Sequence, residues 1–128
     1  VHSIEHNGCG VAPWNLADAK VEQKSTWVTV NSDLLIFYHA QGFKNIRGPF
    51  YSSGLRNFHS KLSGAAKEYI VEPYAQSYVA AVQQSKSVVG INSFAGIRKE
   101  QKKTRKFLRD CKNIFQEWKN QSLVVCWS

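Results

Sequence analysis

One short stretch of the sequence, residues 34–50, combines residue types that suit a diphosphate and its metal ion. It begins with an apolar run that predicts a strand, and His39 follows that run directly. Gly42 comes three residues later, where the absence of a side chain lets backbone N–H groups approach a ligand closely. Lys44 and Arg47 then add positive charge. The imidazole can ligate a divalent cation, and the glycine and the two cations can contact phosphate oxygens.

Each of these residues also has a structural interpretation that the sequence leaves open. A histidine at the end of a strand is more often hydrogen-bonded than metal-bound, so His39 could have either role. Gly42 could serve only a turn, and Lys44 and Arg47 could be solvated charges. Trp14, the remaining residue of interest, could equally lie in the core or contact a substrate.

Two segments of the chain resemble a known enzyme family. Residues 35–44, Leu-Ile-Phe-Tyr-His-x-x-Gly-x-Lys, resemble the C-terminal His-x-x-Gly…Lys motif of retaining GT-A glycosyltransferases, the group that includes glycogenin and bacterial lipopolysaccharide galactosyltransferases. Residues 12–16, Ala-Pro-Trp-Asn-Leu, resemble an element of bacterial glycosyltransferase-like proteins. In those proteins a strand hairpin and the histidine segment follow it in the same order. The resemblance is best over residues 7–56.

The resemblance implies a role for the residues of both segments. His39 would ligate the Mn²⁺ or Mg²⁺ ion that holds a nucleotide-sugar diphosphate, and Gly42 and Lys44 would contact the phosphates. Trp14 and Asn15 would lie near the sugar or the acceptor. The family takes two further metal ligands from an Asp-x-Asp motif, which this sequence lacks. We therefore expect the C-terminal part of a transferase that uses a nucleotide-sugar donor and a sugar or lipid-linked acceptor, inactive by itself.

The segments that must position these residues are predicted to be a strand hairpin followed by helices. Residues 26–30 are β-branched and aromatic and residues 34–38 are apolar, so we expect two antiparallel strands joined by a polar turn. Glycines and a proline between 42 and 54 predict a loop. Within a single α/β domain, residues 1–60 would thus form the strand and loop part and residues 61–128 the helical part. In the family this arrangement is the C-terminal piece of a GT-A fold.

Two or three helices are predicted after the hairpin. The first covers residues 62–88, with Ser63 as N-cap and a break or kink at Pro73. The second covers residues 97–119, where the apolar residues share one face. We expect that face to be turned toward the core and the many lysines and arginines to be solvated. The remaining segments are expected to be a connector and a short apolar tail, residues 89–96 and 123–127.

The basic helix leaves a second class of function open. Its charge could bind anionic lipid at a membrane surface or the phosphates of a nucleic acid. No helix-turn-helix, zinc-ligand spacing or RNA-recognition aromatic pattern supports the nucleic acid. The alternative to the transferase is therefore a small basic module that binds nucleic acid or an anionic membrane.

Composition favours anionic partners and a reducing compartment. Lys and Arg total 17 against 9 Asp and Glu, a net charge of +8. The cysteines Cys9, Cys111 and Cys126 are odd in number and widely spaced, which indicates free thiols. Residues 1–10 lack the features of a signal peptide, and no apolar run approaches the roughly 20 residues that span a bilayer. We expect a cytoplasmic location, free or peripheral at the inner face of a membrane, and, because Met is absent, a fragment.

Overall fold

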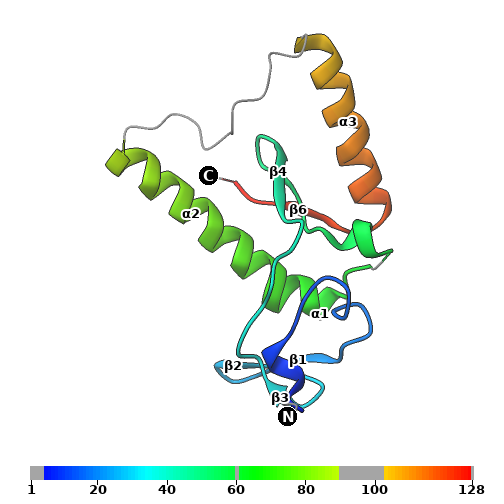
Figure 1. Ribbon diagram of the computed structural model, residues 1–128, viewed down its shortest axis with the longest axis vertical. Helices are drawn as coiled ribbons and strands as arrows, with labels where there is room; N and C mark the ends of the chain where they lie inside the picture. The colour runs from blue at the N-terminus through cyan, green and yellow to red at the C-terminus, as the bar shows by residue number, and fades with distance from the viewer. Residues whose placement is uncertain (1–4, 60, 90–102, 128) are drawn as a thin grey trace, which may run out of the picture.

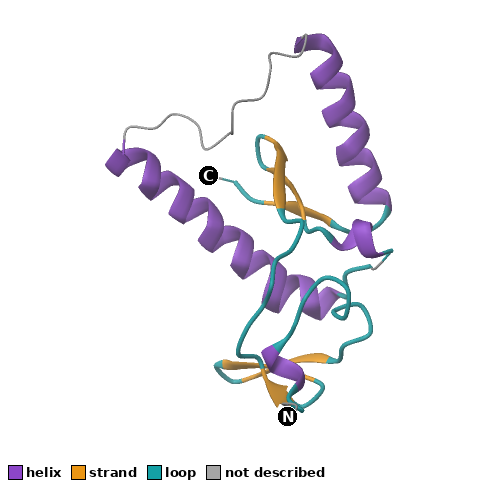
Figure 2. Cartoon of the chain, viewed as in Figure 1, coloured by secondary structure: helices purple, strands orange, loops and turns teal. Residues whose placement is uncertain are grey.

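The computed structural model describes residues 5–59, 61–89 and 103–127, and it has the predicted mixed α/β composition (Figures 1 and 2). Its strands form two three-stranded antiparallel sheets, ordered β1–β2–β3 and β4–β5–β6. In chain order the elements are the 3₁₀ turn η1 (Asn7–Cys9), β1 (Val21–Lys24), β2 (Trp27–Val30), β3 (Asp33–Leu34), β4 (Lys44–Arg47), β5 (Phe50–Ser52), the 3₁₀ turn η2 (Leu55–Phe58), α1 (Gly64–Ala66), the π-helical turn η3 (Lys67–Val71), α2 (Glu72–Val89), α3 (Lys103–Lys119) and β6 (Leu123–Val125).

Of the three strands in the first sheet, the sequence predicted β2 and, in its first residue pair only, β3, but it did not predict β1. The predicted strand is confirmed as β2, and it pairs with β1 on one side and with β3 on the other. Asn31 and Ser32 join β2 to β3, with φ angles of 50° and 75°. Positive φ at both central residues is typical of the two-residue turns whose twist matches that of a hairpin.

The expected strand over residues 34–38 is confirmed only at its start, where Leu34 pairs with Thr29 of β2, and it is not buried. Pairing with β2 continues only as far as Leu35, whose N–H donates to the carbonyl of Val28 at 2.8 Å. The N–H groups of Ile36 and Phe37 then turn away and donate to the carbonyl of Gly8, at 3.0 and 3.1 Å. Both side chains are exposed.

The expected loop between 42 and 54 is wrong, because this segment forms the hairpin of β4 and β5. Gly48, with φ of 52°, makes the turn between the two strands. The segment expected to be an apolar tail supplies the third strand, β6, in which Val125 pairs with Phe50 and Leu123 with Ser52. A strand late in the chain thus completes a sheet that begins in its first half.

The second sheet lies between α2 and α3, as Figure 1 shows. Aromatic rings join it to α2: the ring of Phe43 lies 5.0 Å from that of Tyr74 and 5.4 Å from that of Tyr78. Tyr51 of β5 stacks on Phe43 at 5.5 Å. The buried core runs from the sheets to α2 and includes Val11, Leu16, Val21, Val30, Leu55, Leu62, Ala66, Ile70, Val71, Ala75, Val79, Val124 and Cys126.

The first helical segment begins where the sequence predicted but is not broken at Pro73. The side chain of Ser63 accepts a hydrogen bond from the N–H of Ala66 at 3.1 Å, which confirms it as the N-cap. The π-helical turn η3 comes before the proline, and in it the N–H of Glu72 donates to the carbonyl of Lys67. A wider turn at this point makes room for the proline ring. It also changes which backbone carbonyl is left without a hydrogen bond, since proline has no N–H to donate.

The apolar face of helix α3, which was expected to be turned toward the core, is exposed. Its apolar residues Leu108, Phe115 and Trp118 are exposed, whereas Asp110 and Glu117 are only 6% and 5% exposed. The reason is that arginines from the strand part of the chain attract these two carboxylates, as described below. The predicted start of this helix, 97–102, and most of the predicted connector lie outside the described residues.

Candidate functional site

The structure brings together the two segments that the sequence singled out. A single parallel bridge joins Val11 to Tyr38, and the N–H of His39 donates to the carbonyl of Val11 at 2.7 Å. This places the rings of Trp14 and His39 5.7 Å apart in an edge-to-face arrangement, with an interplanar angle of 89°. Residues from two separate segments thus form one surface feature.

Two further aromatic rings extend this feature. The ring of Phe58 lies 5.5 Å from that of Trp14, and the ring of Phe37 lies 6.4 Å from that of His39. We call these four residues the aromatic cluster. His39 and Phe37 are exposed, and Trp14 is 47% exposed. The cluster therefore presents flat apolar rings and one imidazole to solvent. Trp14 is accordingly not a core residue.

Asn15 holds the turn that presents Trp14. Its side-chain oxygen accepts a hydrogen bond from the N–H of Ala12 at 2.8 Å, and its side-chain nitrogen donates to the carbonyl of Gly10 at 2.9 Å. Leu16, the next residue, is fully buried and fixes the other side of the turn. Both polar groups of the Asn15 side chain thus have partners within the turn, which gives it a positioning role that the sequence interpretation missed. An asparagine three residues after the N–H that it binds is the local signal that indicates such a turn.

Gly42 occupies a position that only glycine accommodates easily. Its φ is 81°, and a Cβ at this position would lie 3.2 Å from the Cα of Gly54 and 3.2 Å from the side-chain nitrogen of Asn57. Gly42 is exposed on its other side. The glycine is therefore explained by a turn and by the close approach of two chain segments, which leaves the predicted phosphate contact open.

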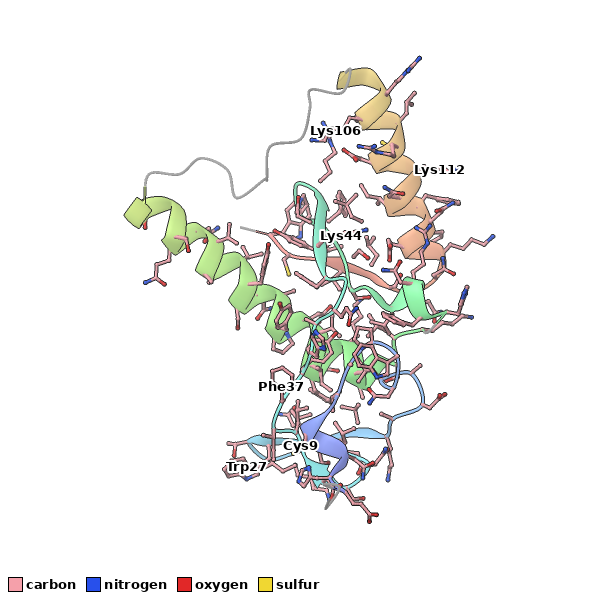
Figure 3. The ribbon with its side chains drawn as sticks, in the orientation of Figure 1. Cys9, Trp27, Phe37, Lys44, Lys106 and Lys112 are labelled. Atoms are coloured by element: carbon pink, nitrogen blue, oxygen red, sulfur yellow. The ribbon has the colours of Figure 1, made fainter. Side chains whose placement is uncertain are left out.

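The two predicted phosphate-binding cations lie on β4, next to α3. Figure 3 shows Lys44 on β4, apart from Phe37 of the aromatic cluster. Lys44 is exposed, whereas Arg47 contacts the carboxylate of Asp110 at 3.5 Å and lies 4.9 Å above the ring of Phe107. Arg47 thus helps to hold α3 in position although about half of its side chain is exposed, whereas Lys44 has no ion pair among the described residues.

A metal ion would find few ligands here. Among residues 5–59, 61–89 and 103–127, no group of three or more His, Cys, Asp and Glu side chains could hold a metal ion. His39 would therefore be a single ligand, and a hard divalent cation prefers several oxygen ligands. The described residues alone do not fit the predicted Mn²⁺ or Mg²⁺ site.

Tyr38, directly before His39, is a residue that the sequence interpretation passed over. Its ring packs edge-to-face on Tyr74 of α2 at 5.7 Å. Burial raises the pKa of its phenol to about 12, and its hydroxyl has no hydrogen-bond partner among the described residues. Tyr38 thus anchors the histidine segment to α2.

The edge of the first sheet is tied to η1 by Asp33. Its carboxylate accepts hydrogen bonds from the backbone N–H of Asn7 at 2.8 Å and from the Asn7 side chain at 2.7 Å. The backbone hydrogen bond is the main reason that the pKa of Asp33 is lowered. A lowered pKa in the folded state means that this stabilisation is present above the ordinary aspartate pKa and is lost as pH falls through the lowered value.

We therefore expect Asp33→Ala to melt at a lower temperature than the unmodified chain at pH 7, and the difference to shrink as pH falls below about 4. The physical reason is that protonation removes from the unmodified chain the same interaction that the substitution removes. Melting curves of both proteins across this pH range measure the effect. A difference that stayed constant down to the lowest pH would show that the carboxylate charge is not involved.

In comparisons with known proteins, no family model, no curated protein and no solved structure matches this chain. Within the part of the chain that the structure describes, none of the helices is long and apolar enough to cross a membrane.

Proposed function

We propose that this chain is the C-terminal part of a GT-A glycosyltransferase, which transfers a sugar from a nucleotide-sugar donor to an acceptor hydroxyl. The observation that carries the proposal is the ring contact between Trp14 and His39. The two family-like segments are separated in sequence, and their functional residues can act together only if the fold brings them side by side. Their contact at an exposed surface is what a shared donor or acceptor site requires.

Each residue of the proposed site has a chemical role that its environment permits. The exposed face of Trp14 can pack against a sugar ring, because tryptophan combines a large apolar surface with a polar edge. Asn15 positions Trp14 through its two hydrogen bonds within the turn. Lys44 is free of any ion pair among the described residues and can contact a phosphate.

The divalent cation belongs to the complete enzyme in this proposal. A bound Mn²⁺ or Mg²⁺ would stabilise the negative charge of the leaving diphosphate. His39 would supply one ligand, and the others would come from a segment with the Asp-x-Asp motif that this sequence lacks. Because the described residues do not form a metal site, we assign no catalytic step to this chain alone.

The exposed apolar run before His39 also supports a larger enzyme. Ile36 and Phe37 lie outside the sheet ladder and are exposed, although the run that contains them is apolar throughout. A run of this kind is usually buried, and a neighbouring part of a GT-A sheet would cover it.

The test compares His39→Ala with the unmodified complete enzyme. We expect Mn²⁺-dependent affinity for the nucleotide sugar to fall about tenfold or more, since loss of even an outer-shell partner of a metal has such an effect. The melting temperature without ligand should change little, because His39 is exposed. A structural histidine would give the opposite result, normal affinity with about 1–3 kcal/mol of lost stability.

Two further measurements accompany this test. Lys44→Ala should weaken nucleotide binding, whereas Lys24→Ala, an exposed lysine of β1, serves as the matched control and should not. The chain of 128 residues, incubated with Mn²⁺ and a panel of nucleotide sugars, should release no nucleoside diphosphate above a heat-killed control. Clear turnover would contradict the proposal that this chain supplies only a part of the enzyme and is inactive by itself.

A further inference from the structure

The orientation of α3 is fixed by its two acidic residues. Arg47 of β4 contacts Asp110 at 3.5 Å, and Arg56 of η2 contacts Glu117 at 3.7 Å. The hydroxyl of Ser122 also donates to the carboxylate of Glu117. Because these groups lie seven residues apart, they share one side of the helix and turn it toward the second sheet.

Beside the face that carries Asp110 and Glu117, α3 has an apolar stripe that borders the second sheet at Arg47 and Leu123: Phe107, Leu108, Cys111, Phe115 and Trp118. Their spacing places them on one face of the helix. Leu108, Phe115 and Trp118 are 64%, 60% and 65% exposed. Together with Leu123 of β6, the C-terminal part of the stripe lines a shallow groove. An exposed apolar surface of this kind is typical of a site that contacts a membrane or another molecule.

The exposed charges around the stripe all have one sign. Both acidic residues of α3 are buried, so the charged side chains that remain exposed on its described part are basic: Arg105, Lys106, Arg109, Lys112 and Lys119. Figure 3 shows Lys106 and Lys112 on different sides of the helix axis. The apolar stripe is therefore bordered by positive charge, the combination that suits a surface with an apolar interior and anionic headgroups.

We propose that α3 binds the surface of an anionic lipid bilayer, lying in the plane of the membrane with its apolar stripe among the acyl chains. A nucleic acid fits less well, because its phosphates would pair with the basic residues but leave the stripe in water. A second copy of the chain fits less well too, since joining two such stripes would bring two sets of basic residues together. The helix would bind lipid whatever reaction the chain serves.

Sedimentation with vesicles tests the proposal on the chain as it is. We expect binding to vesicles of phosphatidylglycerol and phosphatidylcholine that weakens with salt, and little binding to phosphatidylcholine alone. The double variant Phe115→Ser with Trp118→Ser should lower the partition coefficient at least about tenfold, because two large apolar side chains no longer enter the bilayer. Replacing Arg109 and Lys112 with Gln should lower it about fivefold for each charge.

Matched controls separate the helix from general stickiness and net charge. Trp27→Ser with Ile36→Ser removes two apolar side chains far from α3 in sequence, one in β2 and one after β3, each 62% exposed, and should leave binding unchanged. Lys24→Gln with Lys61→Gln removes the same charge elsewhere on the surface. Melting curves verify that each variant is folded, as expected for substitutions at exposed positions.

The cysteines provide an independent readout without any substitution. Cys9 and Cys111 are both exposed, but only Cys111 lies in the stripe. Anionic vesicles should protect Cys111 from a water-soluble thiol reagent while Cys9 stays reactive. The proposal is overturned if the stripe variant binds as well as the unmodified chain, or if Cys111 and Cys9 react alike with vesicles present. It is also overturned if the lipid-free chain is a dimer that the stripe variant dissociates, or if DNA binds the chain and anionic vesicles do not.

Discussion

Replacing Gly54 with alanine is expected to lower the free energy of unfolding by at least about 3 kcal/mol, the sum of a left-handed backbone and an overpacked contact. The φ of Gly54 is 87°, a conformation that side chains with a Cβ disfavour. The added Cβ would also lie 2.2 Å from the carbonyl oxygen of Gln41 and about 3 Å from Gly42. Backbone atoms cannot yield as the end of a flexible side chain does, so the turn after His39 would have to move.

Gly64→Ala is the matched control for this substitution. Gly64 begins α1, a Cβ there would meet nothing within 4 Å, and its φ is not in the left-handed region. Alanine at this position should stabilise the chain by about 0.4–1 kcal/mol, because it reduces the entropy of the unfolded state. Urea denaturation measures both variants. Equal stability of the two would show that the contact between Gly54 and Gln41 is not as close as described.

Replacing Glu117 with alanine is expected to cost about 2–3 kcal/mol of unfolding free energy. The side chain of Glu117 is 6% exposed, and its removal leaves the hydroxyl of Ser122 and the guanidinium of Arg56 without their carboxylate. Breaking a fully buried ion pair costs about 3–5 kcal/mol, but Arg56 is 37% exposed and can regain water, so the effect should be smaller. Urea denaturation again provides the measurement.

A double-mutant cycle with Arg56→Ala separates the ion pair from the rest of the effect. We expect a coupling energy of about 0.5–1 kcal/mol between the two substitutions. Glu68→Ala, which removes an exposed glutamate from η3, should change stability by less than about 0.5 kcal/mol. If Glu117→Ala were as mild as this control, the buried carboxylate would not be what orients α3.

The features that the sequence predicted correctly depend on neighbouring residues. Strand β2 follows from its β-branched and aromatic residues, and the turn after it from Asn31 and Ser32. The N-cap at Ser63 follows from a side chain that binds an N–H three residues later. Both partners of such short-range interactions lie within a few residues of each other, so a short window of sequence is enough to predict them.

The features that it missed depend on distant partners. The chain leaves the ladder after Leu35 because the carbonyl of Gly8 accepts the N–H groups of Ile36 and Phe37. The hairpin of β4 and β5 is stabilised by β6, which comes after both long helices. An amphipathic pattern shows that α3 has an apolar face but not whether that face is buried. The orientation of the helix depends on its ion pairs with Arg47 of β4 and Arg56 of η2, which are distant in sequence.

The candidate site shows the same division. Local spacing led to the hypothesis that His39 and Gly42 bind a metal ion and a phosphate, which stays a prediction, and no spacing rule predicts that Trp14 lies against His39. That contact depends on the bridge between Val11 and Tyr38, which are far apart in the chain. The resemblance to a family suggested that both segments serve one site, and the proposal that they do so awaits the binding measurements.

The pairing of β6 with β5 has a consequence for how the chain is made in the cell. During synthesis β5 leaves the ribosome before α2 and α3, and its outer edge has no partner until β6 follows them. Closing so long a loop is also entropically slow compared with forming the helices. Throughout that interval an unpaired strand edge is exposed on the nascent polypeptide, where edge-to-edge association with other chains can begin. The short length of β5, three residues from Phe50 to Ser52, limits this hazard, because so brief an edge offers few hydrogen bonds to a wrong partner.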